Sequence, residues 1–192
     1  VNEPEKRVKQ YPYELSGGMR QRVMIAMALA CEPDILIADE PTTALDVTIQ
    51  AQILELMQSL QKKLGMAIIM VTHDLGVIAD MCDEIIVMYG GRVCERGTAE
   101  DIFYRPHHEY TKGLLRSIPN VDRIGEKLIP IPGTPINLLN MPKGCAFCPR
   151  CEEAMKICIE EQPPEMQMPD GHFASCWLNV KAAMEEEKGG RQ

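Results

Sequence analysis

A short apolar run that ends in two carboxylates, ILIADE at residues 35–40, most constrains how this chain can fold. Apolar residues followed at once by acids and then by Pro41 are typical of a buried strand in a parallel sheet. A stretch of helix formers precedes this run (residues 19–30), and apolar residues at helical spacing follow it (residues 48–64). A second apolar run lies at residues 66–71. The order strand, helix, strand predicts a right-handed crossover, a parallel sheet and an α/β fold.

Shorter elements are expected further along the chain. They are a helix, a hairpin around Gly90-Gly91 and a second helix, over residues 75–82, 85–95 and 98–103. Thr98 is expected to be the N-cap of the second helix. After Arg105, prolines interrupt a stretch with little periodicity. We interpret that stretch as an extended arm that leads to a cluster of cysteines.

Polar side chains follow both expected strands at the points where the strands end. Asp39 and Glu40 end the first strand, and His73 follows the second. Ligands of parallel sheets bind outside the carboxyl ends of the strands. A carboxylate there can hold Mg²⁺, an adjacent one can orient or deprotonate a water, and an imidazole can donate to a phosphate oxygen. Each residue alone is commonly structural, but their convergence on one sheet edge indicates a site for phosphate chemistry.

A glycine turn, Ser16-Gly17-Gly18, precedes the first expected helix. Two glycines let the backbone approach an anion closely, and the helix N-terminus presents free N–H groups. For these three residues alone, a serine-capped turn is the simpler interpretation. The whole LSGGMRQR string, followed by a strand and an acid pair, favours nucleotide phosphate. Asp46 has two interpretations, a cap for the helix that starts near Val47 or a contact across a dimer interface.

The composition limits the classes of function. Of the 192 residues, 45% are hydrophobic and 25% charged, which is sufficient for a packed core. The formal net charge of −8 argues against a nucleic-acid-binding surface, because such surfaces are basic. The longest apolar runs, residues 23–31 and 66–71, fall far short of the ~20 residues that span a bilayer. The sequence begins at Val1, and we expect an upstream part of the protein to be missing.

Eight cysteines are many for this length, and five of them lie within residues 145–176. Their spacing is C-x2-C-x2-C-x6-C-x17-C. Four thiolates suit either tetrahedral Zn²⁺ or a [4Fe–4S] cluster, and reduced thiols without metal are the alternative. The preceding α/β pattern favours a reducing compartment over a secreted disulfide scaffold. We interpret His172 as a turn residue rather than a ligand, and Cys31, Cys82 and Cys94 as core or strand residues.

Four motifs within residues 13–74 together resemble those of ABC-type ATPases. LSGGMRQRV resembles their signature motif, ILIADE their Walker B strand, TTALD their D-loop and VTHD their switch-histidine loop. This resemblance implies an ATP and Mg²⁺ site in which Asp39 serves the Mg²⁺. It also implies that Glu40 is the general base and that His73 contacts the γ-phosphate.

The same resemblance implies a second ATPase subunit, either homologous or identical. In that family ATP lies between two domains of a head-to-tail dimer, and the signature segment faces the nucleotide of the opposing subunit. The residues implied in nucleotide binding here, besides Asp39, are Ser16, Gly17, Gly18, Gln21 and Asp46. No G-x-x-x-x-G-K-[ST] loop, the Walker A motif, occurs in the chain, so we expect the isolated chain to be inactive.

The rest of the chain resembles the C-terminal extension of oligopeptide, dipeptide and nickel importer ATPases. The matching segments are RPHHEYTKGLLRSIPNVD, IPGTPINL and MPKGCAFCPRC, within residues 105–177. Some of these ATPases hold a [4Fe–4S] cluster through cysteines that match Cys145, Cys151, Cys158 and Cys176. Cys148 falls where relatives often have His, and we therefore regard it as a spare thiol.

This resemblance implies a domain order and a set of partners. We expect a partial ABC-type P-loop nucleotide-binding domain over residues 1–104, with a parallel sheet and a helical signature segment. An irregular cysteine-rich extension follows over residues 105–180, and a disordered tail over residues 181–192. The implied partners are two transmembrane permease subunits and an extracytoplasmic solute-binding protein. The implied location is the cytoplasmic face of the bacterial inner membrane, peripherally bound, and the implied role is to power import of peptides or related solutes.

Two other classes of function remain open from the sequence. A soluble ABC-type ATPase that acts on nucleic acid or ribosomes would combine the same core with a zinc or iron–sulfur site. The acidic net charge and the RPHHEYTKGLLRSIP stretch disfavour it. A metal-binding interaction module without activity of its own is the other alternative.

Overall fold

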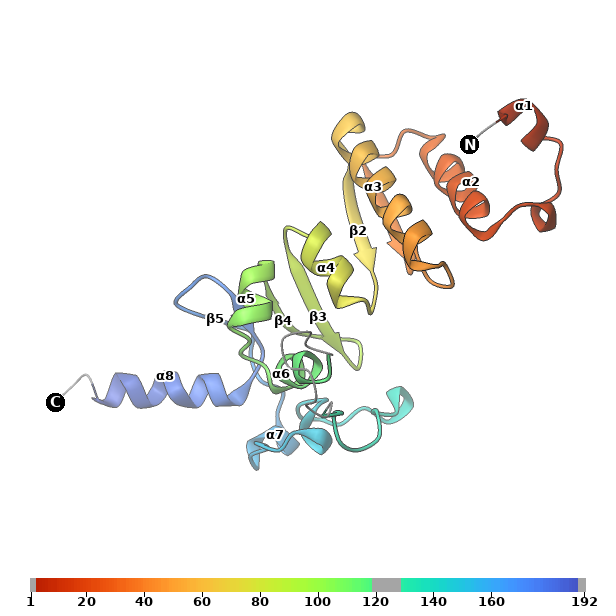
Figure 1. Ribbon diagram of the computed structural model, residues 1–192. Helices are drawn as coiled ribbons and strands as arrows, with labels where there is room; N and C mark the ends of the chain where they lie inside the picture. The colour runs from red at the N-terminus through yellow and green to blue at the C-terminus, as the bar shows by residue number, and fades with distance from the viewer. Residues whose placement is uncertain (1–2, 119–128, 190–192) are drawn as a thin grey trace. The chain divides into compact units, whose positions relative to one another are not determined.

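The computed structural model describes residues 3–118 and 129–189 (Figure 1). It divides into two compact units, Val1–Met81 and Cys82–Gln192. Within the described residues, no helix has both the length and the hydropathy needed to cross a membrane.

The first unit contains two parallel strands with helices before, between and after them. Its helices are α1 (Pro4–Arg7), a 3-10 turn at Pro12–Glu14, α2 (Gly17–Leu29), α3 (Val47–Leu64) and α4 (Leu75–Met81). Its strands, β1 (Ile35–Asp39) and β2 (Ala67–Val71), pair in parallel, with Ile35 opposite Ala67 and Asp39 opposite Val71. The predicted strand–helix–strand crossover is thereby confirmed. Gly65 ends α3 in the left-handed conformation (φ 68°), which glycine adopts without steric cost.

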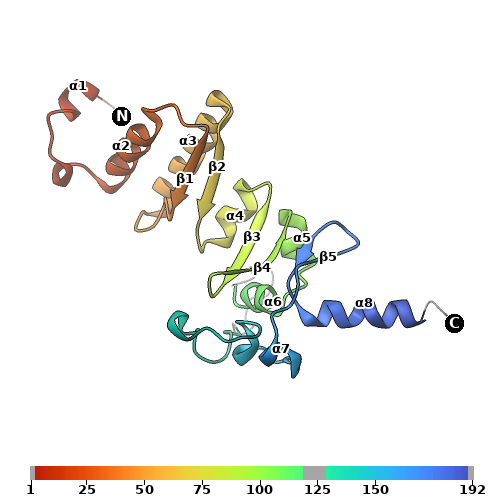
Figure 2. The same ribbon diagram turned by 180° about the vertical axis from the view of Figure 1, so that it is seen from behind.

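Only one face of the β1–β2 pair is covered within this unit. Helix α3 lies on one side of the strands, as Figures 1 and 2 show from opposite directions. The core on that side is built on Ile25, Ile53 and Met57. The opposite face leaves four aliphatic side chains at least half exposed, namely Ile35, Ile37, Ile69 and Val71. Our expectation of fully buried strands is therefore wrong for this structure, because no element among residues 3–81 packs on that face.

The second unit contains a four-stranded sheet in the order β3-β4-β6-β5. The elements are β3 (Ile85–Tyr89), β4 (Arg92–Gly97), α5 (Ala99–Tyr104), α6 (Glu109–Arg116), 3-10 turns at Leu138–Asn140 and Cys148–Arg150, α7 (Ile157–Glu160), β5 (Met166–Gln167), β6 (Phe173–Ala174) and α8 (Trp177–Gly189). The hairpin expected around Gly90-Gly91 is confirmed. Thr98 is confirmed as the N-cap of α5, because its hydroxyl accepts from the Asp101 N–H. All the strand pairs in this sheet are antiparallel.

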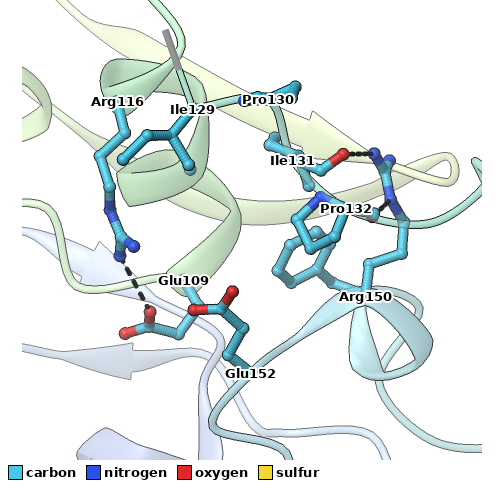
Figure 3. A pocket seen from close by; sticks show the side chains of 10 residues that line it. Glu109, Arg116, Ile129, Pro130, Ile131, Pro132, Arg150 and Glu152 are labelled. Carbon is cyan, nitrogen blue, oxygen red and sulfur yellow. Dashed lines mark hydrogen bonds and ion pairs between the residues drawn. The ribbon is translucent and has the colours of Figure 1, made fainter. Parts of the chain in front are cut away.

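Within the second unit, Arg150 holds the segment around Ile131 and Pro132 in place. Arg150 donates from Nε to the carbonyl of Pro132 (2.8 Å) and from a terminal nitrogen to that of Ile131 (3.0 Å) (Figure 3). Ile131 also packs against a core that contains Tyr89 and Phe147. The part of the expected extended arm that the structure describes is thus fixed to the cysteine-rich segment by hydrogen bonds to its carbonyl groups.

The structure differs from our expectations for α6 and for Cys31. Helix α6 lies where we expected an extended arm, and His108 Nδ1 caps it by accepting from Tyr110 N–H (3.0 Å). For residues 181–192 we expected a fraying helix and a disordered tail; helix α8 confirms the helical part, and residues 190–192 lie outside the described residues. Cys31 is exposed rather than in a core, whereas Cys94 is buried on β4 as expected.

The contacts also divide the chain earlier than the domain boundary expected after residue 104. Strand β6, which lies in the expected extension, pairs with β4 and so joins the β3–β4 hairpin to the second unit.

Candidate functional site

The carboxyl ends of β1 and β2 bring Glu40 and His73 together. His73 Nδ1 lies 2.7 Å from Glu40 Oε1. The parallel register produces this contact, because it aligns Asp39, the last residue of β1, with Val71, the last of β2. The Glu40 N–H also donates to the Val71 carbonyl (2.8 Å), which extends the pairing by one residue. The two side chains predicted to act on the terminal phosphate and the attacking water therefore meet at one sheet edge.

The surroundings of Glu40 favour its ionised form. Its second carboxylate oxygen accepts a hydrogen bond from the Thr43 hydroxyl. That bond, and after it the bond from His73, lowers the pKa of Glu40 below its ordinary value. The hydrogen bond to Glu40 correspondingly raises the pKa of His73. Glu40 also has a left-handed backbone (φ 49°), which is uncommon for a residue with a Cβ and is concentrated at functional sites.

Asp74 and Gln50 are site residues that the sequence reasoning missed. Gln50 Nε2 on α3 donates to Asp74 Oδ2 (2.9 Å), and this bond is the main reason that the pKa of Asp74 is lowered. Asp74 Oδ1 accepts from the N–H groups of Gly76 (3.0 Å) and Val77 (3.3 Å) at the start of α4. The available signal was an Asp directly before a helical segment, a common N-cap. These bonds hold the loop that presents His73.

Two further predicted site residues are aspartates, Asp39 at the end of β1 and Asp46 at the start of α3. Asp39 ends β1 with an exposed side chain, next to Glu40. Asp46 caps α3, with its Oδ1 accepting from the Ile49 N–H (3.0 Å). The capping interpretation of Asp46 is confirmed, and a contact of Asp46 with nucleotide or with a partner stays a prediction.

The glycine turn lies at the N-terminus of α2, against the start of α3. Ser16 is the N-cap, and its Oγ accepts from Met19 N–H (3.4 Å). A Cβ placed on Gly18 would lie 2.6 Å from Ile49 Cγ2, and one on Gly17 would lie 3.3 Å from Leu45 Cδ2. These glycines therefore have a packing role, close contact between α2 and α3, besides the role at a phosphate that we predicted. Gln21 lies one turn further along α2 and is half-buried.

Substituting Gly18→Ala should destabilise the first unit by about 1–3 kcal/mol, the usual cost of overpacking. The added methyl group would overlap Ile49, whose branched side chain has few alternative rotamers. Chemical denaturation of the variant measures the loss. Ile49→Ala removes the atom that the new methyl group would overlap. Ile49→Ala should therefore cost less stability in the Gly18→Ala variant than in wild type. Strict additivity of the two substitutions would contradict the packing role.

The cysteine-rich segment is folded around hydrogen-bonded turns. All eight cysteines are free thiols. Cys145 N–H donates to the Cys158 carbonyl (2.8 Å), and Cys148 and Cys151 N–H groups continue the turns. Burial raises the pKa of Cys145, and the charge of Cys158 adds to that shift. Burial also raises the pKa of Cys151 to about 12, with a smaller contribution from the charge of Cys176. A backbone hydrogen bond thus joins Cys145 and Cys158, two of the four positions in our metal prediction, and the metal site itself stays a prediction.

A cavity of about 40 Å³ in the second unit contains none of the predicted site residues (Figure 3). Isoleucines, prolines and Phe147 line it together with two glutamates and two arginines. One such pair, Arg116 and Glu109, lies 3.6 Å apart. The cavity is far below the roughly 300 Å³ of a small-molecule pocket, so we assign it no ligand.

The geometry defines a class of protein. Parallel strands that end in an acid pair and a histidine, with a serine-capped glycine turn at a neighbouring helix, are the parts of an ABC-type ATPase domain. The ABC transporter family model matches residues 1–43. The model described as oligopeptide/dipeptide transporter, C-terminal region, matches residues 94–158.

Relatives agree with both matches. The chain is 55% identical over 183 residues to the dipeptide transport ATP-binding protein DppD of Bacillus subtilis, covering 95% of this chain and 55% of that protein. It is 60% identical over 176 residues to the oligopeptide transport ATP-binding protein OppD of the same organism, covering 91% and 49%. OppD of Salmonella typhimurium is 56% identical over 179 residues, covering 93% and 53%. A solved structure of cbiO1 from Clostridium perfringens, part of an ABC transporter complex, is 42% identical with a TM-score of 0.45 and covers 47% of this chain and 36% of its own.

Over nearly its whole length the chain is similar to the ATP-binding subunits of ABC transporters of the oligopeptide/dipeptide type. It spans about half of the length of the relatives named above.

Proposed function

We propose that the full-length protein containing this chain binds and hydrolyses ATP to power import of peptides or related solutes across a bacterial inner membrane. The observation that supports this most directly is the Glu40–His73 pair, 2.7 Å apart at the ends of adjacent parallel strands. A carboxylate kept ionised can orient or deprotonate an attacking water, and the imidazole beside it can contact a terminal phosphate. Both groups are exposed in this chain and therefore accessible to a nucleotide.

In this proposal the ATP is held between two ATPase subunits. Asp39 would serve the Mg²⁺, and Ser16, Gly17, Gly18 and Gln21 would face the nucleotide of the opposing subunit. A serine-capped helix N-terminus with two glycines supports an anion-binding role. The partner is a homologous or identical subunit, and Asp46 would lie near that interface.

The uncovered face of the β1–β2 pair supports the view that more of the ATPase domain packs here. Four half-exposed aliphatic side chains on one sheet face are costly to leave in water. Because the relatives are about twice as long as this chain, we propose that their additional residues cover this face in the full-length protein. Residues 1–104 would then be part of one nucleotide-binding domain, and residues 105–180 an extension specific to this type of importer.

The proposed assembly includes two transmembrane permease subunits and an extracytoplasmic solute-binding protein. The ATPase would bind the permeases peripherally on the cytoplasmic face of the inner membrane. Names of the relatives as dipeptide and oligopeptide transport ATP-binding proteins support this class of substrate.

Purification of the tagged full-length protein from detergent-solubilised native membranes tests the proposed function. We expect permease subunits to co-purify and ATP hydrolysis to rise when binding protein and peptide are added. Co-purification of ribosomes or nucleic acid in place of permeases would overturn the proposal.

A [4Fe–4S] cluster held by Cys145, Cys151, Cys158 and Cys176 is part of the same proposal, with Zn²⁺ as the alternative metal. The donor chemistry fits, because all four residues are free thiols and a backbone hydrogen bond joins the Cys145 and Cys158 positions. Electrostatic coupling of Cys145 with Cys158, and of Cys151 with Cys176, also supports their proximity. When bound, such a group would link the segment around residue 145 to the start of α8.

Substituting Cys151→Ser should abolish iron and sulfide binding and the visible absorbance of the cluster in anaerobically purified full-length protein. Removal of one thiolate leaves the cluster without its fourth ligand. Cys31→Ser, an exposed thiol in the first unit, is the matched control and should retain iron. Cys148→Ser should retain it also if this thiol is a spare. A colourless, zinc-loaded wild type would rule out iron.

A further inference from the structure

A second group of possible metal ligands lies in the second unit, apart from the cysteine set. His107 precedes α6, while Asp170 and His172 belong to the turn between β5 and β6. One ligand atom from each residue lies within 4.8 Å of the others. The two imidazole rings are 4.8 Å apart between centroids. His107 is half-buried, Asp170 exposed and His172 buried, so the group lies at the edge of the core with access to solvent.

His172 is held in one orientation by a buried carboxylate. Its Nε2 lies 2.8 Å from Glu95 Oε1, and both side chains are fully buried. Glu95 also accepts the backbone N–H groups of His107 and His108, so its position on β4 is fixed. Because an ionised carboxylate can only accept, the proton of this bond belongs to Nε2. His172 lies in the β5–β6 turn as expected, and its side chain in addition contacts a buried carboxylate.

The other nitrogen of His172 has no hydrogen-bond partner. Nδ1 is buried, and no donor or acceptor within hydrogen-bonding distance satisfies it in the described residues. A buried polar atom without a partner costs about 1–3 kcal/mol, so such atoms in native proteins usually have a partner, which can be a water or an ion. With Nε2 protonated, a neutral ring directs an unshared pair from Nδ1 toward Asp170, whose Oδ2 lies 3.9 Å away. Glu95, which binds the other ring nitrogen, is placed like the carboxylate that usually orients a metal-bound imidazole from outside the metal's own ligands.

The third ligand, Asp170, accepts the His172 backbone N–H at Oδ1 (3.2 Å). Its second oxygen, Oδ2, is only loosely engaged by other groups. Arg105 Nε lies 3.8 Å from Asp170 Oδ2, but the same guanidinium donates a shorter bond of 2.5 Å to Asp101. Gly171, between the two ligands of this turn, has a left-handed backbone (φ 92°). Asp170 Oδ2 can therefore turn toward His172 Nδ1 while Oδ1 keeps its bond to the His172 backbone N–H.

We propose that His107, Asp170 and His172 form a binding site for a divalent transition metal of the zinc class, with Glu95 orienting His172. Two imidazoles and a carboxylate suit Zn²⁺ with a fourth, exchangeable ligand. Neighbouring ligands of tetrahedral Zn²⁺ are about 3.3 Å apart, given Zn–N distances of about 2.0 Å. The group must therefore close on binding, mainly by movement of His107 and Asp170, since Glu95 holds His172. The metal would fasten the β5–β6 turn to the loop before α6.

Cobalt titration distinguishes this site from the cysteine set. Thiolate ligands give Co²⁺ an intense near-ultraviolet charge-transfer band, whereas a site of nitrogen and oxygen ligands shows only weak visible bands. We expect the purified full-length protein, with its thiols alkylated, to bind one equivalent of Co²⁺. The bound Co²⁺ should show only the weak visible bands of nitrogen and oxygen ligands, and Zn²⁺ should displace it. His107→Ala and Asp170→Asn should each weaken binding at least tenfold, and Glu95→Gln about 10–100-fold as an outer partner.

Glu165→Gln is the matched control, because this exposed carboxylate in the same unit pairs with Arg96 and not with the proposed ligands. It should leave Co²⁺ affinity unchanged. If Glu95→Gln fails to fold, Asp170→Asn still tests the proposal, since it changes an exposed side chain. Absence of Co²⁺ binding in the alkylated protein, or equal affinity in wild type, His107→Ala and Asp170→Asn, would overturn it.

Discussion

Replacing Glu40 with glutamine in the full-length protein should lower steady-state ATP hydrolysis by about 10²–10⁴-fold, the range for loss of a positioned general base. Glutamine keeps the size of the side chain and one oxygen to accept from Thr43 or His73, but it cannot take a proton from water. ATP should still bind and close the dimer, so the variant should retain unhydrolysed nucleotide. Phosphate release and the nucleotide retained after gel filtration measure the two effects.

The controls for this experiment separate chemistry from stability. Glu55→Gln changes an exposed carboxylate on α3, away from the sheet edge, and should hydrolyse ATP at the wild-type rate. Thermal unfolding of Glu40→Gln should stay close to wild type, because its pair with His73 is exposed. A wild-type hydrolysis rate in Glu40→Gln would remove Glu40 as the base.

Replacing Gly144 with alanine should destabilise the second unit by about 3 kcal/mol or more, the upper end of the cost of overpacking. A Cβ at this position would overlap the Cys158 carbonyl oxygen and lie 2.6 Å from the backbone of Ile159. The oxygen cannot easily turn away, since it accepts the Cys145 N–H at 2.8 Å. Calorimetric unfolding should show a lower Tm by about 10 °C or more.

Gly91→Ala provides the matched comparison for Gly144→Ala. Gly91 has a left-handed backbone (φ 74°), and a Cβ there would meet no atom within 4 Å. Its substitution should therefore cost only the backbone strain of about 1–2 kcal/mol. Equal losses in the two variants would mean that the chain around Gly144 relaxes, and would contradict the close approach. A real loss at Gly144 should also reduce the metal binding that we propose for the neighbouring cysteines.

Local elements were predictable because their signals are local. The crossover from β1 to β2, the hairpin at Gly90-Gly91 and the cap at Thr98 follow from periodicity and from turn or capping residues. Helix α6 was missed since flanking prolines suggested an extended arm. Its N-terminus uses His108, a residue that sequence patterns do not associate with caps.

The candidate site was only partly predictable. Strand ends indicated that Glu40 and His73 would share one sheet edge, and they are in contact across 33 residues of sequence. The bond from Gln50 to Asp74, which supports that loop, was not predictable, because Gln50 lies on a helix face without a distinctive pattern. The close fit of Gly18 on Ile49 likewise depends on how α2 meets α3.

The sequence by itself determined the order of the elements, their caps and the acids and histidine at the strand ends, because these depend on neighbouring residues. Tertiary structure alone decided which distant side chains meet. It placed Glu95 on His172 across 77 residues, and among residues 3–118 and 129–189 it left one imidazole nitrogen of that histidine without a partner. Such a pairing depends on sheet order and packing, and neither of these is encoded in the residues next to His172.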